Sequence, residues 1–505
     1  MKLEVKFLEN EYWWGGSVNA GHFMPFDKNS ALDYDLSNHV GGGNDQYSPI
    51  MLSSKGRYIW SEKPFTISVK DGVITLDGED FDFNEDNRDL RSAYLSAMEK
   101  HFPFNGKTPD ELFFKAVQYN TWIEMGTDQT TEKILKYANE IIDNGMQPGV
   151  MMIDGGWQED YGTYEFNRRK IPDPKFLMDE LHRLGYKVII WVSPIVSSAG
   201  TQYKMLRDKG FLVKNAEGRI AIRQWWSGYS AVLDLTNPEA REWMQGEMDR
   251  LMELYDVDGF KFDAGDAYFY DDGDLTYEKV LAREHTTYFN EVGAKYAFNE
   301  FRAGYKFGGR EIVARLHDKK HNWKNDGIRA LVPQTIVQGL LGYAYCCPDM
   351  VGGGDLVGAA GLGEIDEELF IRWTQANALL GMMQMSIAPW RVLSKETYEI
   401  VKKYISLHAE FGEHFVELGR HASKTGEPVV RAMAYQFPGE GLDGINDEFV
   451  LGDDIIVAPV IEKGVRERVV YLPKGKWQES DGTVYEGGEH TIAVPLEKLL
   501  WFKKI

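Results

Sequence analysis

The pattern of hydrophobic and polar positions divides the chain into three regions. In the first, short alternating runs separated by Gly, Asn and Asp are typical of strands, and we expect strands at 2–8, 56–61, 65–69 and 73–76. Lys70-Asp71-Gly72 lies between the last two and predicts a hairpin turn, because Gly accepts a positive φ. This pattern predicts an N-terminal β-sandwich over residues 1–105.

The second region, 106–395, alternates apolar runs with amphipathic helical segments. The helical segments cover 131–144, 174–184, 238–255 and 278–292. The strand-like runs cover 117–122, 150–154, 188–191, 259–263, 296–300, 312–315, 343–347 and 382–386. Eight strand candidates that alternate with helices favour a (β/α)₈ TIM barrel over an open sheet.

The third region, 396–505, returns to strands. A helix at 395–411 leads into expected strands at 454–457, 468–471, 490–494 and 500–502. Lys474-Gly475-Lys476 and Asp481-Gly482 are expected to be turns. The predicted fold is therefore α/β: a barrel flanked by an N-terminal and a C-terminal β-sandwich.

Composition narrows the class of protein. The 505 residues are 43% hydrophobic, which supports a sizeable core and excludes a disordered chain. The formal net charge of −22 argues against a nucleic-acid or anionic-membrane partner and favours a small-molecule substrate. The two cysteines, Cys346 and Cys347, are adjacent, which excludes a disulfide framework and favours a reducing compartment. With no apolar leader segment at the N-terminus and no long apolar run, we expect a soluble, cytoplasmic protein. The sequence leaves its oligomeric state open, and a homo-oligomer is one possibility.

Carboxylates follow several expected barrel strands. Asp154, Asp263, Asp326 and Asp349 lie at or after the second, fourth, sixth and seventh strands. In a barrel of this kind the loops at the C-terminal ends of the strands build the active face. Lys261 and Asp263 point the same way on a strand, so the ammonium favours the ionised form that a nucleophile requires. The alternative is a solvated ion pair at a strand end.

Asp326 stands three residues after Trp323, in a loop ahead of Gly327. A carboxyl group in a partly apolar pocket has a raised pKa and can protonate a leaving oxygen. Asp before Gly is also common in turns with no further role.

Tryptophans cluster around the same strand ends, beside charged residues: Trp122, Trp157, Trp191, Trp225, Trp226 and Trp323. Sugar rings offer apolar faces that aromatic side chains bind, although some of these tryptophans are expected in the core. Two carboxylates in an aromatic, polar lining indicate glycoside hydrolysis. HExxH, EF-hand and CxxC motifs are absent from the sequence, and the reaction needs no cofactor, so we expect neither metal nor cofactor.

These motifs, in this order, resemble glycoside hydrolase family 31, the retaining α-glycosidases. The resemblance rests on Trp14-Gly15-Gly16, Gln118 to Glu124, Phe260 to Asp266, Trp323 to Gly327, Pro348 to Gly353, Ala458-Pro459-Val460 and Leu472 to Trp477. The chain looks most similar to the subgroup that contains the myogenesis-regulating glycosidase, which implies α-galactosidase activity on an oligosaccharide or other α-glycoside.

The resemblance also implies roles for individual residues. Asp263 matches the family nucleophile and Asp326 the acid/base. Residues at positions that line the site of the non-reducing sugar are Asp154, Trp191, Trp226, Lys261, Arg315 and Asp349, with Arg302 and Trp323 as further candidates. Where many members end the last barrel strand with Arg-Asn-His, this chain has Gln384-Met385-Ser386. The missing histidine argues against a glucosidase.

Other functions remain open from the sequence. Within enzymes, the alternatives are α-glucosidase and α-xylosidase, with transglycosylation in place of hydrolysis. Outside enzymes, the alternative is a catalytically dead barrel that binds carbohydrate, against which the presence of both Asp263 and Asp326 argues.

Overall fold

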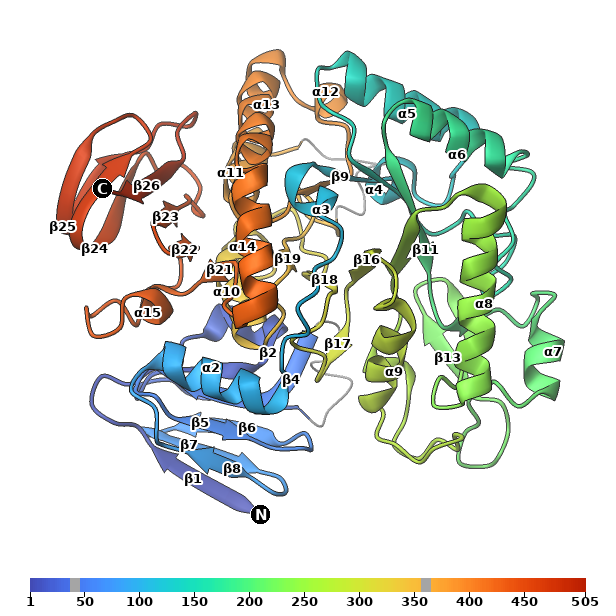
Figure 1. Ribbon diagram of the computed structural model, residues 1–505, viewed down its shortest axis with the longest axis horizontal. Coiled ribbons are helices and arrows are strands. Elements are labelled where there is room, and N and C mark those ends of the chain that lie inside the picture. Colours follow the sequence, from blue (N-terminus) through green and yellow to red (C-terminus); the bar gives the residue numbers. More distant parts are fainter. Residues whose placement is uncertain (37–45, 356–364) are drawn as a thin grey trace.

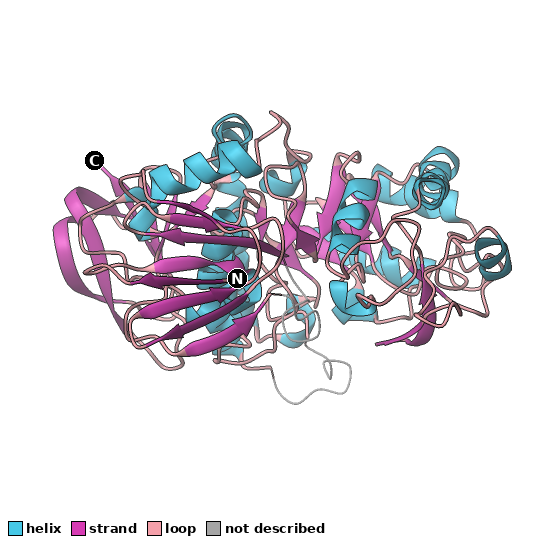
Figure 2. Ribbon diagram, turned by 90° about the horizontal axis from the view of Figure 1, so that it is seen from below, coloured by secondary structure: helices cyan, strands magenta, loops and turns pink. Residues whose placement is uncertain are grey.

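The computed structural model describes residues 1–36, 46–355 and 365–505. A region of two N-terminal sheets is followed by a parallel barrel and a C-terminal sheet, in the order expected from the sequence (Figure 1). Both flanking sheet regions lie on one side of the barrel (Figure 2). The predicted fold class is confirmed. In the described part of the chain, no helix has the length and apolar character needed to cross a membrane.

The N-terminal region consists of two sheets and a covering helix. One sheet has the strand order β1-β7-β6-β3, and the other has the order β17-β4-β5-β8 with β2 paired to β4. The N-terminal strands and the helix are β1 (Lys2–Lys6), β2 (Trp13–Ser17), β3 (Leu32–Asp35), β4 (Gln46–Ser53), β5 (Tyr58–Trp60), β6 (Thr66–Lys70), β7 (Val73–Asp77), β8 (Asp82–Asn84) and α2 (Leu90–His101). The predicted hairpin joins β6 to β7, and both Asp71 and Gly72 have positive φ as a tight turn requires.

Eight parallel strands form the barrel sheet, in the order β19-β18-β16-β15-β11-β10-β9-β20. They are β9 (Gln118–Asn120), β10 (Val150–Ile153), β11 (Lys187–Val192), β15 (Gly259–Phe262), β16 (Phe298–Phe301), β18 (Val313–Arg315), β19 (Cys346–Cys347) and β20 (Gln384–Met385). Each overlaps one of the eight runs expected from the sequence. Because the strands are parallel, their C-terminal ends meet on one face of the barrel.

Helices surround the barrel and carry sequence-encoded caps. Asp173 accepts a hydrogen bond from the N–H of Phe176 and precedes Pro174, which starts a helix well because its φ is already helical. The helices of this region are α3 (Leu112–Lys115), α4 (Trp122–Met125), α5 (Thr131–Asp143), α6 (Pro174–Arg183), α7 (Tyr203–Asp208), α8 (Pro238–Tyr255), α9 (Glu284–Gly293), α10 (Leu331–Leu340), α11 (Glu367–Ala378), α12 (Pro389–Val392) and α13 (Lys395–Glu410). The described residues also form 3₁₀ turns at η1 (Val18–Phe23), which precedes the barrel, η2 (Ala267–Phe269) and η3 (Ile328–Ala330).

The barrel departs from a regular alternation in two places. Between β16 and β18, where every residue is described, no helix forms, and β17 (Gly304–Tyr305) instead pairs with β4 of the N-terminal region. After β11, a small antiparallel sheet is inserted, made of β12 (Ile195–Val196), β13 (Ile222–Trp225) and β14 (Gly228–Val232). The sequence pattern did not predict this sheet.

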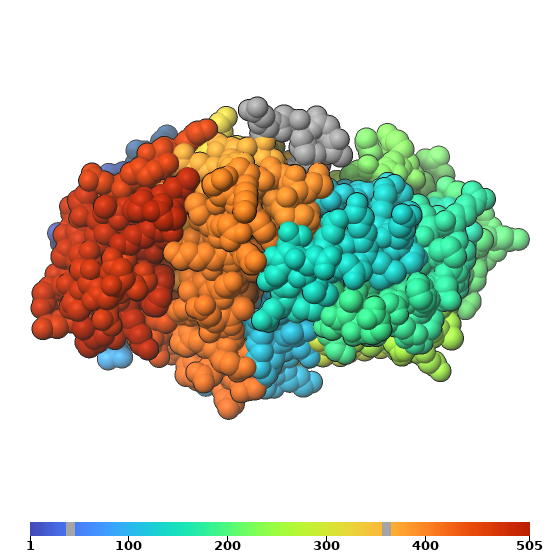
Figure 3. Space-filling view, turned by 90° about the horizontal axis from the view of Figure 1, so that it is seen from above, coloured from blue at the N-terminus to red at the C-terminus, as the bar shows by residue number. Residues whose placement is uncertain are grey.

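A six-stranded sheet with the order β21-β22-β23-β26-β24-β25 makes the C-terminal region. The elements of the C-terminal region are α14 (Gly412–Thr425), α15 (Met433–Gln436), β21 (Val430–Arg431), β22 (Phe449–Leu451), β23 (Ile455–Ala458), β24 (Glu467–Glu479), β25 (Val484–Ala493) and β26 (Leu500–Lys504). The expected turn at Lys474-Gly475-Lys476 is wrong, because these residues lie within β24, where the pairing register shifts. In the space-filling view, the helical segment shown in orange separates this sheet from the first half of the barrel (Figure 3).

Candidate active site

Asp263 directly follows β15, at the C-terminal end of the barrel, and lines a pocket of about 490 Å³. Burial alone would raise the pKa of its carboxyl group. The positive charges of Arg302 and Lys261, with a hydrogen bond from Trp191, outweigh burial and hold this pKa well below its usual range. Asp263 is therefore an ionised carboxylate, as predicted for a nucleophile.

The two oxygens of Asp263 are not equivalent. Oδ1 accepts hydrogen bonds from Arg302 Nε at 2.8 Å and from the backbone N–H of Ala264 at 2.9 Å. Oδ2 accepts one, from the indole N–H of Trp191 at 3.0 Å. Among the described residues, Oδ2 thus has the fewer donors and keeps more lone-pair density for a bond to carbon.

Arg302 joins Asp263 to a second carboxylate. Its two terminal nitrogens donate to Asp266 at 3.0 and 2.6 Å, and Asp266 is fully buried. Burial is the largest influence on Asp266 and raises its pKa to about 6, against the charge of Arg302. We expected Arg302 to contact sugar. It does line the pocket, but its hydrogen bonds to both carboxylates show that it also orients the nucleophile.

Lys261 and Asp154 form a buried ion pair that lines the same pocket. Asp154 directly follows β10, and its backbone N–H donates to Thr121 Oγ1 at 2.9 Å. Lys261 lowers the pKa of Asp263, as the strand geometry predicts, but its ion-pair partner is Asp154. The two strand ends therefore place both acids and the ammonium in one pocket.

Aromatic side chains form much of the pocket wall: Trp122, Tyr161, Trp191, Trp226 and Tyr268. Trp226 lies in the turn between β13 and β14 and is 50% exposed, an unusual exposure for a tryptophan and suited to stacking on a ligand. Tyr161 packs edge-on against Trp191 and bonds the hydroxyl of Ser227. Trp157, in contrast, is fully buried and supports Trp191 by donating to its carbonyl oxygen.

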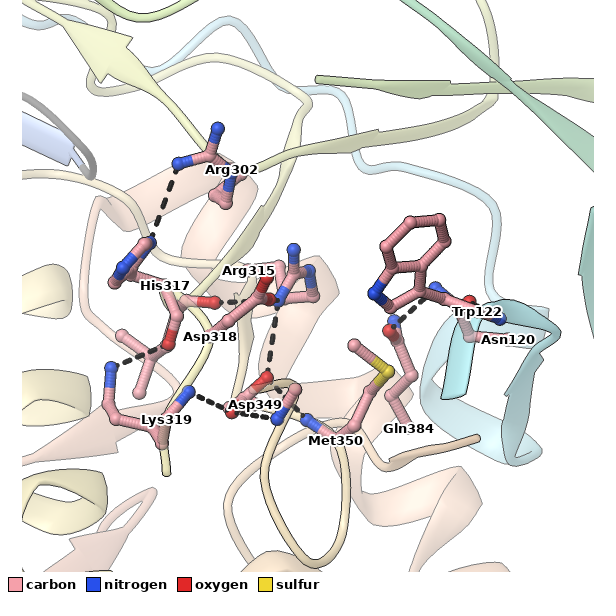
Figure 4. A network of polar contacts seen from close by, with 12 residues as sticks. Asn120, Trp122, Arg302, Arg315, His317, Asp318, Lys319, Asp349, Met350 and Gln384 are labelled. Atoms are coloured by element: carbon pink, nitrogen blue, oxygen red, sulfur yellow. Dashed lines mark hydrogen bonds and ion pairs between the residues drawn. The ribbon is translucent and has the colours of Figure 1, made fainter. Parts of the chain in front are cut away.

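Two predicted sugar contacts, Arg315 and Asp349, are not among the residues that line the pocket of Asp263. Arg315 is buried and binds Glu300 at 3.1 Å. It also binds Asp318 at 2.7 Å and Asp349 at 3.2 Å (Figure 4). Asp349 also accepts the backbone N–H groups of Lys319, Met350 and Gly354 at 2.6 to 2.8 Å. These bonds connect the loop after β18 to the loop after β19, and both loops contribute residues to the pocket lining. Arg315 and Asp349 therefore position these loops.

Asp326 lies outside the pocket of Asp263. It is half exposed, paired with Lys320 at 3.1 Å and bonded by Asn322 at 3.0 Å. These two hydrogen bonds lower its pKa, so the expected partly apolar surroundings and raised pKa are wrong. Trp323 is half-buried and donates to Asp366 at 2.9 Å, and it is not part of the described pocket wall.

Asp326 instead lines a neighbouring depression of about 640 Å³. The depression and the pocket share His317, Asp318 and Asp355 in their linings, so the two spaces are adjacent. Asn19 and His22 of η1 also line the depression, which brings the N-terminal region to the site.

His317 and Asp318 were not singled out from the sequence. Strand β18 ends at Arg315, and only Leu316 separates it from His317 and Asp318. The rule that residues after barrel strands form the active face therefore applies to them as it does to Asp263. We took the more distant Asp326 as the acid after this strand, because it matches the family motif. Figure 4 shows both residues beside Arg302 and Arg315.

Comparison with known families settles the class of the chain. The model of the "Glycosyl hydrolases family 31 TIM-barrel domain" matches residues 115–414, and that of the "Glycosyl hydrolase family 31 C-terminal domain" matches residues 426–504. The chain belongs to glycoside hydrolase family 31. Asp263 and the pocket around it lie within the barrel match.

Relatives in family 31 differ in their named activities. The myogenesis-regulating glycosidase of Mus musculus is 32% identical over 412 residues, which is 79% of this chain and 57% of the relative's own length. Alpha-glucosidase 2 of Bacillus thermoamyloliquefaciens is 27% identical over 541 residues, covering 96% of this chain and 67% of the relative. The solved structure of a cycloalternan-degrading enzyme from Trueperella pyogenes matches all of this chain and 81% of its own, with a TM-score of 0.85 at 19% identity, and thus shares the fold.

Proposed function

We propose that this protein is a retaining, exo-acting α-glycoside hydrolase that removes a terminal α-linked hexose through a covalent glycosyl-Asp263 intermediate. The observation that carries the proposal is the environment of Asp263: an ionised carboxylate in an aromatic-walled pocket, with Oδ2 bonded only by Trp191 among the described residues. A carbohydrate-binding barrel has no need for such a charged, oriented acid.

In the first step, Asp263 Oδ2 attacks the anomeric carbon while the bond to the leaving oxygen breaks. An acid on the opposite side protonates that oxygen, and a glycosyl ester forms. In the second step the same acid, now a base, takes a proton from water, and the water displaces Asp263 with net retention. If a sugar hydroxyl replaces water, the product is a transglycoside.

The second carboxyl group of this mechanism is proposed to be Asp326, which matches the family motif. Retaining enzymes hold their two carboxyl groups about 5–5.5 Å apart. Asp326 lines only the depression, whereas Asp318 lines both the depression and the pocket of Asp263. Asp318 is therefore the alternative on geometric grounds.

The sugar is proposed to be α-galactose. This rests on the resemblance to the subgroup of the myogenesis-regulating glycosidase and on the end of the last barrel strand. There Ser386 occupies the position of the sugar-contacting histidine, and its buried side-chain oxygen accepts the backbone N–H of Ile123 at 2.7 Å. α-Glucosidase and α-xylosidase are the alternatives, supported by relatives with those names.

The test is hydrolysis of p-nitrophenyl α-glycosides of galactose, glucose, xylose and sulfoquinovose, followed by Asp263→Gly with added azide. We expect the highest kcat/KM on the α-galactoside, and a β-galactosyl azide from the variant, because azide takes the place of the missing carboxylate. Preference for another sugar contradicts the galactoside assignment alone. Turnover of none of the four, with sugar binding retained, contradicts the enzyme assignment.

A further inference from the structure

Arg283, the residue directly before α9, has an unusual environment for a buried arginine. It is 2% exposed, and its Nε and the terminal nitrogen Nη2 have no hydrogen-bond partner in the part of the chain that the structure describes. Among the described residues, no other side chain has two buried polar atoms without a partner. Buried charges are normally paired, because an uncompensated one is strongly destabilising.

Two buried tyrosines lie beside this guanidinium group. Arg283 Cζ is 4.4 Å from the centre of the Tyr47 ring on β4, and this ring is 5.0 Å from the ring of Tyr305 on β17. The strands β4 and β17 pair with each other, and β17 contacts α9 (Figure 1). Both hydroxyl groups also lack a partner among the described residues.

Both tyrosines are hydrogen-bond donors. Burial raises the pKa of each hydroxyl group, that of Tyr47 to about 12, although the charge of Arg283 opposes the shift. Each hydroxyl therefore keeps its proton at neutral pH. The face of an aromatic ring attracts a cation but leaves its N–H groups without a strong acceptor. The cluster thus combines one positive charge with several protons to donate.

The acidic side chains whose charges act on the two tyrosines are bonded to other groups. Asp266 accepts both terminal nitrogens of Arg302, Glu284 accepts a backbone N–H at 2.8 Å, and Glu62 pairs with a lysine at 2.9 Å. None of the three forms a hydrogen bond or an ion pair with Arg283. Within the described part of the chain, the guanidinium charge therefore has no carboxylate partner.

We propose that Arg283, Tyr47 and Tyr305 bind a small monovalent anion, chloride or a similar halide, between the N-terminal region and α9. A water molecule can accept the same hydrogen bonds, but only an anion compensates the guanidinium charge. Thr286 also lies near the Tyr47 hydroxyl, so the first turn of α9 adds the partial positive charge of a helix N-terminus. The burial of the donors favours a singly charged ion, because a multivalent anion loses more hydration energy.

The proposed ion lies behind the loop that carries Asp266. Ala267 directly follows Asp266 and packs with Tyr47 and Tyr305 in one apolar cluster. An anion at this place holds the backbone of that loop against the N-terminal region without reaching the sugar. Its expected effect is therefore on the stability of the fold.

Thermal unfolding in sodium chloride and in sodium gluconate, at equal ionic strength, measures this effect. We expect the Tm of the wild-type protein to be about 2–4 °C higher at saturating chloride, because the ligand binds only the folded state. Arg283→Met keeps a long unbranched side chain but removes the charge and its donors, so its Tm should not respond to chloride. In gluconate this variant should be at least as stable as wild type, because it buries no uncompensated charge.

Tyr305→Phe removes one donor and keeps the ring. It should raise the half-saturating chloride concentration about tenfold, the effect of one lost hydrogen bond. The matched control is Tyr435→Phe on α15, whose hydroxyl is also buried without a partner among the described residues. The arginine over its ring, Arg431, is already paired with Glu427 at 3.0 Å, so this variant should respond to chloride as wild type does.

Crystals grown with bromide in place of chloride locate the ion by anomalous scattering. We expect a bromide peak in contact with Arg283 and the two tyrosine hydroxyls. A water molecule at this position with no bromide peak overturns the proposal, as does a wild-type Tm that is equal in the two salts. An equal loss of Tm in both salts for Arg283→Met also overturns it, since it indicates a purely structural role. If that variant does not fold, the Tyr305→Phe titration and the bromide map decide. Neither measurement involves a sugar, so the outcome is independent of the proposed function.

Discussion

Arg302 donates its Nε–H to the nucleophile candidate Asp263 at 2.8 Å while both terminal nitrogens bond Asp266. One guanidinium group thus bonds two buried carboxylates, one of which has to stay ionised for catalysis. The planar shape of Arg fits this role because its fork of donors fixes the carboxylate orientation as well as its charge.

Replacing Arg302 should shift the pH dependence of catalysis. The charge of Arg302 is the largest influence that lowers the pKa of Asp263. In Arg302→Gln this pKa should rise, so the acidic limb of kcat/KM should move to higher pH by one unit or more. Arg302→Lys keeps the charge and should shift the limb less. A pH profile of kcat/KM on an aryl α-glycoside measures this, and an unmoved limb in Arg302→Gln would show that another group controls it.

Asp263→Asn should leave sugar binding intact and lower kcat at least about a thousandfold, because the amide cannot form the glycosyl ester. The substitution is near-isosteric, but the amide NH₂ cannot accept, so the variant keeps either the hydrogen bonds from Arg302 and Ala264 or the one from Trp191. Calorimetric binding of the product sugar is the control for folding. Near-normal hydrolysis of an activated aryl α-glycoside by this variant removes Asp263 as the nucleophile.

The proton donor is identified by its dependence on the leaving group. We expect Asp326→Asn to lower kcat/KM for an α-linked disaccharide by about 10²–10⁴-fold and to spare kcat/KM for an α-glycosyl fluoride, whose leaving group needs little protonation. The second step loses its base with either substrate, so kcat should fall for the fluoride as well. Added azide should then yield an α-glycosyl azide. Asp318→Asn is the comparison variant, and the same signature in that variant instead would assign the acid to Asp318.

Gly259 at the start of β15 is required by packing. A Cβ at this position would lie 1.9 Å from the carbonyl oxygen of Phe298 on the paired strand β16. Gly259→Ala should therefore destabilise the protein by about 1–3 kcal/mol and displace the strand that ends at Asp263. Gly246→Ala within α8 meets no atom within 4 Å and should stabilise by about 1 kcal/mol. Urea unfolding of both variants gives the comparison, and a Gly259→Ala protein as stable as wild type would refute the packing argument.

The barrel could be predicted because several of its strands, β10 and β15 among them, are buried and mainly apolar runs that a polar residue follows. Asp154 and Asp263 follow such runs directly, so periodicity alone placed them at the active face. The three-stranded insertion after β11 was missed, since short exposed strands such as β13 carry no clear alternation. β24 was also underestimated, because the Gly-containing segment within it is a shift of register and not a turn.

Side-chain contacts within the loops could not be predicted in the same way. Asp349 and Asp154 both follow a barrel strand closely, yet only Asp154 is in the described pocket wall. The difference arises from the loop after β19, where Asp349 turns inward to accept three backbone N–H groups. His317 has no sequence signal of its own beyond its distance from β18. Such contacts depend on the path of each loop, which hydrophobic patterning does not specify.

The pairing of β17 with β4 binds the N-terminal region to the catalytic face of the barrel. Gln46 of β4 donates to the carbonyl oxygens of Arg302 and Arg315, and Gln338 of α10 donates back to Gln46 at 2.8 Å. The backbone that carries the guanidinium group beside Asp263 is thus held from outside the barrel. The two regions should therefore unfold as one cooperative unit, and a barrel separated from its first hundred residues would lose the alignment of its charged centre before it lost its strands.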